Sequence, residues 1–198
     1  VKQVVRLDAR APAPTLINRG EAGVTRNTGL YARPGQALAI TLPAAAVADG
    51  LTLRVGIHTD ELFEQDRWLR CPAVTREVRL TGLVTRVASA FGGLVQVLVP
   101  PGCARGPLDL TVEGAVPAPA YRVGVDPAAA WPRLRAQPGA WGYLETSNFC
   151  LYVSRRQLMT LDNPDEVAGH WDRVISLCDR MLGYAGGRRR GEAALTGL

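Results

Sequence analysis

Short segments in which apolar and polar residues alternate make up much of the first 125 positions. The clearest lies at 51–60, where positions 51, 53, 55 and 57 are all aliphatic. This period of two is typical of a strand with one buried face. Similar segments lie at 38–42, 74–80, 83–87, 108–112 and 121–125, and the apolar run at 94–99 is consistent with a strand buried on both faces. Short strands separated by Pro and Gly, with almost no helix, predict a β-sandwich.

Two of these segments, 94–99 and 108–112, are separated by a loop that contains Pro100, Pro101 and Gly102. A short Pro/Gly loop between two strands predicts a β-hairpin. We therefore expect these two strands to lie side by side in one sheet.

The pattern changes near Asp126. A strand is predicted at 149–153. A helix is predicted after it, with Asn163 as N-cap, Pro164 at the first helical position and Glu166 at the capping-box spacing. The apolar residues of this helix recur at spacings of three and four, which predicts one buried face. They are Val167, Trp171, Val174, Ile175, Cys178, Met181 and Leu182. The strand and helix indicate the start of a second, mixed α/β domain.

The expected protein is therefore mainly β and has four parts. Residues 1–26 are predicted to be a linker or a partly ordered segment, because 9–14 is rich in Pro and Ala. Residues 27–125 form the β-sandwich. Residues 126–183 start the mixed domain with one amphipathic helix. Residues 184–198, rich in Gly and Arg, are predicted to be a disordered tail.

Composition and charge exclude several classes of protein. Of the 198 residues, 47% are hydrophobic and 21% charged, which excludes wholesale disorder. The net charge is +5, but the basic residues are scattered, so we predict no nucleic-acid partner. A mild positive charge favours an acidic partner or an anionic membrane face.

The longest apolar run is too short to span a bilayer, so any membrane association is expected to be peripheral. The chain begins with Val1 and is expected to be a fragment of a longer protein.

The four cysteines, Cys71, Cys103, Cys150 and Cys178, do not form a CxxC pair. Nothing in their spacing predicts a zinc site. We expect buried free thiols in a reducing compartment.

Three polar residues, His58, Thr59 and Asp60, follow the strand at 51–57. They form either a binding cluster or a set of hydrogen bonds that shapes the loop, and we favour the second. A catalytic triad would need a nucleophile, and neither GxSxG nor a reactive-cysteine motif is present.

Trp68 and Arg70 follow, and both residue types dominate recognition surfaces. The alternative is that Trp68 closes the end of the sandwich and Arg70 pairs with Asp60 or Glu61.

Trp131, Trp141 and Tyr143 form a second aromatic group. They could stack on a sugar ring, but we prefer a seam between the two domains. His170 lies on the predicted helix outside any HExxH motif, so we interpret it as a residue of the polar flank and not as a metal ligand. No P-loop, GxGxxG or EF-hand occurs, and no cofactor is predicted.

Several short motifs, in order, resemble a known family. They are TGLY at 28–31, PG at 34–35, GIHTD at 56–60, WLR at 68–70, GGL at 92–94, VEGAVPAPAY at 112–121 and PGAWGYLETSN at 138–148. The first five are similar to the N-terminal β-domain of enhancin-like metallopeptidases. The last two narrow the resemblance to the TRP-channel-associated factors of vertebrates, over about residues 28–182.

The resemblance implies an intracellular adaptor at the cytoplasmic face of the plasma membrane. Such factors bind a TRP melastatin cation channel, promote its delivery to the plasma membrane, and modulate its gating and cell migration. The wider family carries a zinc-binding HExxH helix that this sequence does not contain, so no catalytic residue is carried over and no enzyme activity is expected. The remainder of the peptidase-like domain is a further expected partner.

Two functions from different classes remain. The first is a non-catalytic binding module for a channel or another membrane protein. The second is a substrate- or glycan-binding accessory domain of an enhancin-like zinc metallopeptidase. Free cysteines favour the first and a disulfide pair the second.

Overall fold

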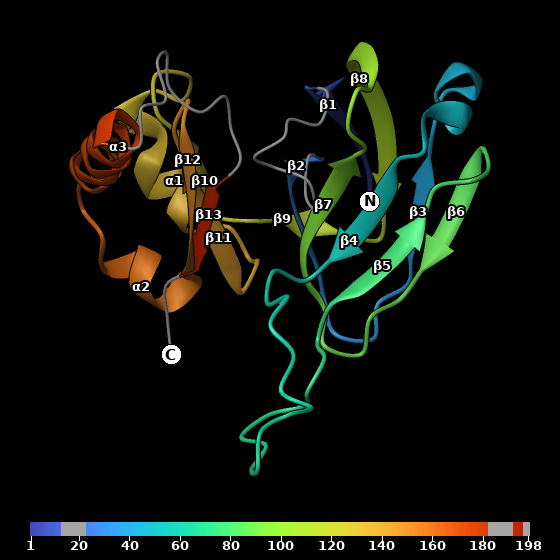
Figure 1. Cartoon of the computed structure of the whole chain (residues 1–198), viewed down its shortest axis with the longest axis horizontal. Helices are drawn as coiled ribbons and strands as arrows, with labels where there is room; N and C mark the ends of the chain where they lie inside the picture. The colour runs from blue at the N-terminus through green and yellow to red at the C-terminus, as the bar shows by residue number, and fades with distance from the viewer. Residues whose placement is uncertain (13–22, 182–191, 196–198) are drawn as a thin grey trace. The chain divides into compact units, whose positions relative to one another are not determined.

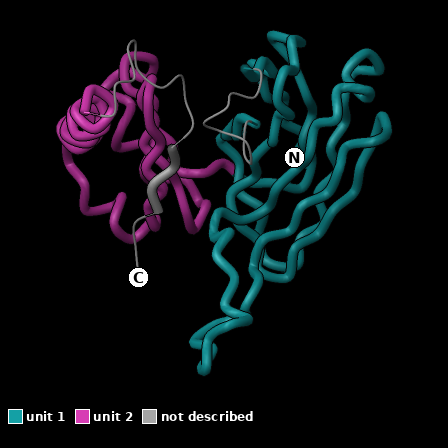
Figure 2. The backbone as a smooth tube through the Cα atoms, in the orientation of Figure 1, with its two compact units in different colours: residues 1–116 teal, residues 117–198 magenta. Residues whose placement is uncertain are grey.

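The computed structural model describes residues 1–12, 23–181 and 192–195. The chain divides into two compact units, Val1–Val116 and Pro117–Leu198 (Figure 2). The boundary falls nine residues before the one expected from sequence, because the segment at 121–125 belongs to the second unit. Each unit has its own hydrophobic core.

The first unit is a β-sandwich, as predicted (Figure 1). One sheet has the strand order β1 (Lys2–Arg10), β8 (Ala104–Glu113), β3 (Leu38–Thr41) and β6 (Val84–Val87). The other has the order β5 (Arg76–Arg79), β4 (Thr52–Val55), β7 (Gly93–Val99), β2 (Val24–Ala32) and β9 (Val116–Pro117). A 3-10 helix, η1 (Ala44–Asp49), precedes β4. The core consists of alternate aliphatic residues from both sheets, including Leu53, Val97 and Leu110. The period-two pattern therefore identified the buried face correctly.

The N-terminal segment corrects one expectation. Residues 2–10 form a full strand, β1, which pairs antiparallel with β8 from Lys2 opposite Glu113 to Arg10 opposite Ala104. Val5, Leu7 and Ala9 alternate along β1 and are buried in the core. The Pro-rich composition of 9–14 hid this alternation. The next strand, β2, begins at Val24, and residues 13–22 lie outside the described part.

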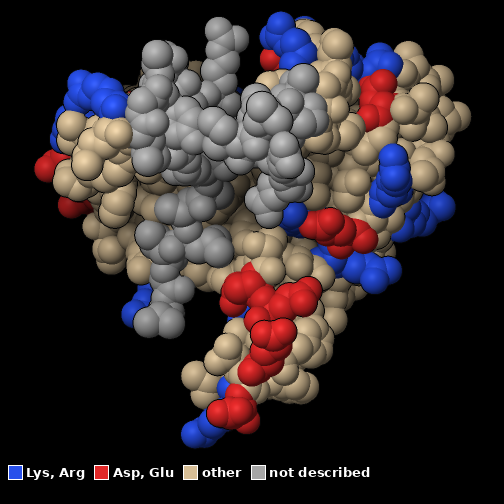
Figure 3. Space-filling view, viewed as in Figure 1, with Lys and Arg blue, Asp and Glu red and all other residues tan. Residues whose placement is uncertain are grey.

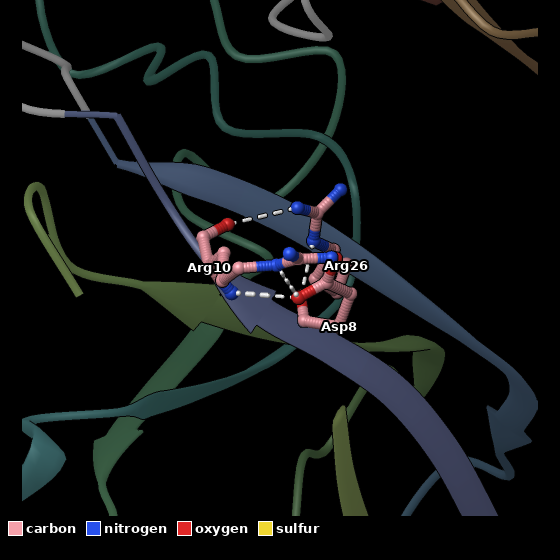
Figure 4. A network of polar contacts seen from close by, with 3 residues as sticks. All are labelled: Asp8, Arg10 and Arg26. Carbon is pink, nitrogen blue, oxygen red and sulfur yellow. Dashed lines mark hydrogen bonds and ion pairs between the residues drawn. The ribbon is translucent and has the colours of Figure 1, made fainter. Parts of the chain in front are cut away.

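Arg26 joins β2 to β1, which belong to different sheets (Figure 4). Its Nε donates to the carbonyl oxygen of Asp8 at 2.7 Å, and its Nη2 donates to the carbonyl oxygen of Arg10 at 2.9 Å. The strand register shifts between Asp8 and Arg10, so these carbonyls lie at an irregularity of β1. The side chain of Arg10 in turn binds the carboxylate of Asp8 and holds the pKa of that carboxyl below its usual range. The network fixes an edge of the sandwich.

The expected hairpin of 94–99 and 108–112 is wrong. β7 pairs with β4 and β2, whereas β8 pairs with β1 and β3 in the other sheet. The loop with Pro100 and Gly102 therefore carries the chain across the core. β7 is largely buried on both faces and β8 on one. Burial alone does not say whether two strands are neighbours in a sheet or face each other across a core.

The second unit contains a four-stranded mixed sheet with helices packed on one face. Its strands, in sheet order, are β10 (Ala120–Arg122), β11 (Trp141–Glu145), β12 (Phe149–Ser154) and β13 (Glu192–Leu195). The middle pair is antiparallel, and each outer strand is parallel to its neighbour. The helices are η2 (Ala128–Ala130), α1 (Trp131–Arg135), α2 (Arg155–Thr160) and α3 (Pro164–Met181). The mixed α/β unit with an amphipathic helix is as predicted, while β11 and α2 were not foreseen.

The long helix begins where the sequence indicates. The backbone N–H of Glu166 donates to Oδ1 of Asn163 at 3.2 Å, so Asn163 caps α3. Its apolar face is only partly covered. Val167, Ala168 and Ile175 pack on the core, whereas Trp171, Cys178 and Met181 are exposed. The prediction of one fully buried face is therefore wrong for these three residues, because the core side of α3 lies around Ala168.

The expected disordered tail is also corrected. Residues 192–195 form β13, which extends the sheet by pairing with β12. A short edge strand is held by backbone hydrogen bonds and needs few core side chains, so composition gives little sign of it. Residues 182–191 and 196–198 lie outside the described part, and with them Leu182 and the Arg188–Arg190 triplet.

Candidate functional site

A long loop, residues 56–75, joins β4 to β5 and projects beyond the ends of the strands (Figure 1). We call it the arm. It carries all five residues proposed as a binding loop. They are His58, Thr59, Asp60, Trp68 and Arg70. The structure separates them into a base and a tip.

The arm leaves the sheet at a close contact between two glycines. The backbone N–H of Gly56 donates to the carbonyl oxygen of Leu94 at 2.9 Å. A Cβ atom on Gly93 would lie only 2.5 Å from the Cα of Gly56, so no other residue fits there without a shift of the backbone. Both glycines also have positive φ angles, 99° and 134°, which L side chains rarely adopt. The glycines therefore fix the point at which the arm begins.

An ion pair closes the base of the arm. The guanidinium of Arg70 binds the carboxylate of Asp60 and also donates to the carbonyl oxygens of Asp60 at 3.1 Å and Cys71 at 2.8 Å. The backbone N–H of Leu62 donates to the carbonyl oxygen of Pro72 at 3.1 Å, which ties the two sides of the arm together. This pairing of Arg70 with Asp60 is the alternative considered from sequence to a recognition role for Arg70.

His58 lies beside this ion pair. Its side chain is half-buried, and this burial is the main reason that the pKa of the imidazole is lowered. The positive charge of Arg70 also lowers this pKa, whereas the negative charge of Asp60 raises it. Thr59 and Asp60 are exposed. The cluster thus combines a histidine, a carboxylate and a guanidinium that organise a loop.

The tip of the arm presents apolar side chains to solvent. Phe63 is 59% exposed, Trp68 55% and Leu69 84%. The rings of Phe63 and Trp68 pack edge to face, with centroids 6.0 Å apart and planes at 88°. Trp68 therefore does not close the end of the sandwich. Phe63 was not identified from the sequence. A usable signal was present, because an aromatic residue in a charged loop without alternating apolar positions is often exposed.

Acidic residues flank the apolar tip. The arm contains Asp60, Glu61, Glu64 and Asp66 against Arg67 and Arg70, a net charge of −2 in a chain whose net charge is +5. Acidic side chains gather along the arm in the space-filling view (Figure 3). The arm is therefore a local region of negative charge on a basic protein.

The second proposed aromatic group does not form one surface. Trp131 is 2% exposed in the core of the second unit, where its Nε1 donates to the carbonyl oxygen of Leu161 at 2.7 Å. Leu144 of β11 packs in the same core, so strand alternation places Trp141 and Tyr143 on the opposite face of the sheet. Tyr143 is buried there against Tyr152, with ring centroids 6.3 Å apart. The expectation that Trp131 belongs to an aromatic surface is thus corrected.

The residues present do not fit a zinc centre. The chain has only two histidines, His58 and His170, one in each unit. No group of three or more His, Cys, Asp or Glu residues within 1–12, 23–181 and 192–195 is arranged to hold a metal ion. No disulfide joins any of the four cysteines. The expectation that they are buried is wrong for Cys71 and Cys178, which are exposed.

No helix in the part of the chain that the structure describes is both long enough and apolar enough to cross a membrane.

A β-sandwich followed by a mixed α/β unit defines the class of protein. The sequence pattern of the N-terminal domain of M60-like peptidases matches residues 8–113, and that of peptidase M60, enhancin and enhancin-like proteins matches residues 114–196. The chain belongs to this M60-like family. The two matches meet within a few residues of the boundary between the structural units.

Several curated relatives are named TRPM8 channel-associated factor 2. The chain is 35% identical to the protein of Homo sapiens over 166 residues and 34% identical to that of Mus musculus over 165 residues. Each alignment covers 83% of this chain, which spans 18% of the length of either relative. The resemblance to channel-associated factors found in the sequence motifs is therefore confirmed.

Solved structures confirm the fold at low sequence identity. A conserved Bacillus anthracis protein of unknown function matches 98% of this chain and 41% of its own, with a TM-score of 0.74 and 16% identity. The IMPa protein of Pseudomonas aeruginosa, solved with an O-glycopeptide, matches 89% of this chain and 20% of its own, with a TM-score of 0.61 and 18% identity.

Proposed function

We propose that the chain is a non-catalytic binding module of a channel-associated factor. It binds a TRP melastatin cation channel at the cytoplasmic face of the plasma membrane, promotes delivery of the channel to that membrane, and modulates channel activity and cell migration. The observation that carries this proposal is the identity of 34–35% with TRPM8 channel-associated factors over 83% of the chain. The exposed aromatic tip of the arm supports a role in recognition.

The test is co-precipitation of the purified 198-residue chain with a detergent-solubilised TRP melastatin channel. The control is an unrelated cation channel in the same detergent. Retention of the melastatin channel alone is expected, together with an increase in biotin-accessible channel when the chain is co-expressed in cells. Equal retention of both channels, or of neither, would contradict the proposal.

A second function, a substrate- or glycan-binding accessory role beside an enhancin-like metallopeptidase, is favoured by one observation. IMPa, which shares the fold, was solved with an O-glycopeptide, and Trp68 offers an exposed ring to a sugar. Binding to an array of mucin-type O-glycans that is lost in Trp68→Ser would support this role over the channel adaptor.

A further inference from the structure

Three large apolar side chains of the arm, those of Phe63, Trp68 and Leu69, are exposed, and the rings of Phe63 and Trp68 pack against each other. Single exposed apolar residues are common on proteins, but a contiguous group on a projecting loop is typical of a contact surface. Aromatic residues supply most of the binding free energy at such surfaces when they are desolvated by a partner. The tip therefore has the chemistry of a docking surface.

The arm is also held in place before any partner binds. The Asp60–Arg70 ion pair and the bond from Leu62 to Pro72 join its two sides, and the contact of Gly56 with Gly93 fixes its root. A preformed loop loses less conformational entropy on binding than a disordered one. This favours recognition by the arm as it stands.

The negative charge around the tip of the arm indicates what kind of partner binds there. Asp60 is paired with Arg70, which leaves Glu61, Glu64 and Asp66 against the single basic residue Arg67. A negative rim attracts a cationic partner and repels the anionic surface of a membrane leaflet. In the edge-to-face packing of Phe63 and Trp68, one ring covers a face of the other. That face is then not available to stack on a sugar.

We propose that the tip of the arm docks a cationic segment of a partner protein, with Phe63, Trp68 and Leu69 contacting its apolar side chains and Glu61, Glu64 and Asp66 facing its Lys and Arg residues. This inference rests on and deepens the proposed function, since it names the surface through which the module binds. The exposed apolar residues of α3, such as Met181, are a weaker candidate, because nothing in the described residues shows what covers them.

The experiment uses the whole 198-residue chain in four forms and two readouts. The first readout is selection of random 12-residue peptides displayed on phage, and the second is the channel co-precipitation described above. Leu83, the control position, is exposed on the turn after β5, at the end of the sandwich away from the arm. The forms are the wild type, the tip variant Phe63→Ser with Trp68→Ser, the charge variant Glu61→Gln with Glu64→Gln and Asp66→Asn, and the control variant Leu83→Ser.

The peptides selected by the wild type are expected to carry net positive charge and at least one aromatic or aliphatic residue. Their affinity should fall by about 30-fold or more in the tip variant, and remain unchanged in Leu83→Ser. In the charge variant, affinity should fall and its dependence on salt should weaken. All substituted side chains are exposed, so we expect the urea midpoints of the variants to equal that of the wild type. Equal midpoints verify that the variants are folded.

Neutral or acidic selected peptides, or equal binding by the tip variant, would overturn the inference. So would arm-dependent binding to phosphatidylserine vesicles in place of peptides, or an arm-dependent dimer of the chain in sedimentation. If the tip variant retains the channel as well as the wild type does, the proposed function stands and this inference fails. If the wild type does not retain the channel but selects cationic peptides through the arm, the proposed function fails and this inference stands.

Discussion

Arg26 and Asp8 are joined across the edge of the sandwich by a 2.7 Å hydrogen bond from Nε to the carbonyl oxygen of Asp8. The bond connects strands of different sheets and lies where the register of β1 shifts. The guanidinium donates to two backbone carbonyls at this irregularity, those of Asp8 and Arg10. This side chain therefore stabilises the first strand of the protein.

Replacing Arg26 by Met should lower the free energy of unfolding by about 2–3 kcal/mol, because two backbone carbonyls lose a charged donor. Urea unfolding monitored by circular dichroism measures this loss. Arg10→Met is the control, since Arg10 binds Asp8 on the solvent-exposed side, and it should cost clearly less. Equal losses in the two variants would show that Arg26 does not hold the strand edge.

Tyr121 links β10 to α3 by donating from its hydroxyl to Oδ2 of Asp165 at 2.9 Å. Burial and this bond raise the pKa of Tyr121 to about 12. The folded state thus holds the phenolic proton more tightly than the unfolded state. Its contribution to stability is complete below the unfolded pKa of about 10 and is lost as the pH rises through about 12.

Tyr121→Phe should therefore lower stability by about 1 kcal/mol at neutral pH and lose less stability than the wild type between pH 9 and 12. Urea midpoints across this range test both effects, and absorbance at 295 nm follows the phenol directly. In Asp165→Asn, the tyrosine should titrate at lower pH than in the wild type but above 10, because burial is the larger cause of the shift. Parallel alkaline profiles for wild type and Tyr121→Phe would contradict this assignment.

His58 should make the protein sensitive to mild acid. Burial holds the pKa of its imidazole in the folded state below 6.5, so the unfolded state takes up the proton first. The corresponding stability is present above pH 6.5 and is lost as the pH falls through the folded-state pKa. His58→Gln should lose less stability than the wild type between pH 7.5 and 5, as measured by urea midpoints.

The glycine contact at the root of the arm gives a steric prediction. Gly93→Ala should cost about 3 kcal/mol or more, because the new Cβ would lie 2.5 Å from Gly56 and the residue would keep a positive φ. Gly102→Ala is the matched control: its φ is also positive, but nothing lies within 4 Å of the added Cβ. That control should cost about 1 kcal/mol. Similar losses in both variants would show that the close contact is not what requires glycine at position 93.

Local sequence predicted the strands and the long helix because the periodicity of apolar residues marks which side of an element is buried. Leu53 and Val55 alternate with polar neighbours and are fully buried, and Asn163 caps α3 as its spacing with Glu166 indicates. The same signal failed for β1, where small and Pro-rich composition masked the alternation of Val5 and Leu7.

The sequence by itself determined that this protein is a β-sandwich followed by a mixed unit, and its motifs identified the family. Only the tertiary structure decided that β7 and β8 lie in different sheets and that Arg26 stabilises β1. It also decided that Trp131 and Trp141 lie on opposite sides of one sheet. The contact of Phe63 with Trp68 at the tip of the arm was likewise decided by the tertiary structure. Burial is encoded residue by residue in hydrophobicity. The choice of neighbour is made by backbone hydrogen bonds and side-chain contacts between residues far apart in the chain, which leave no local pattern.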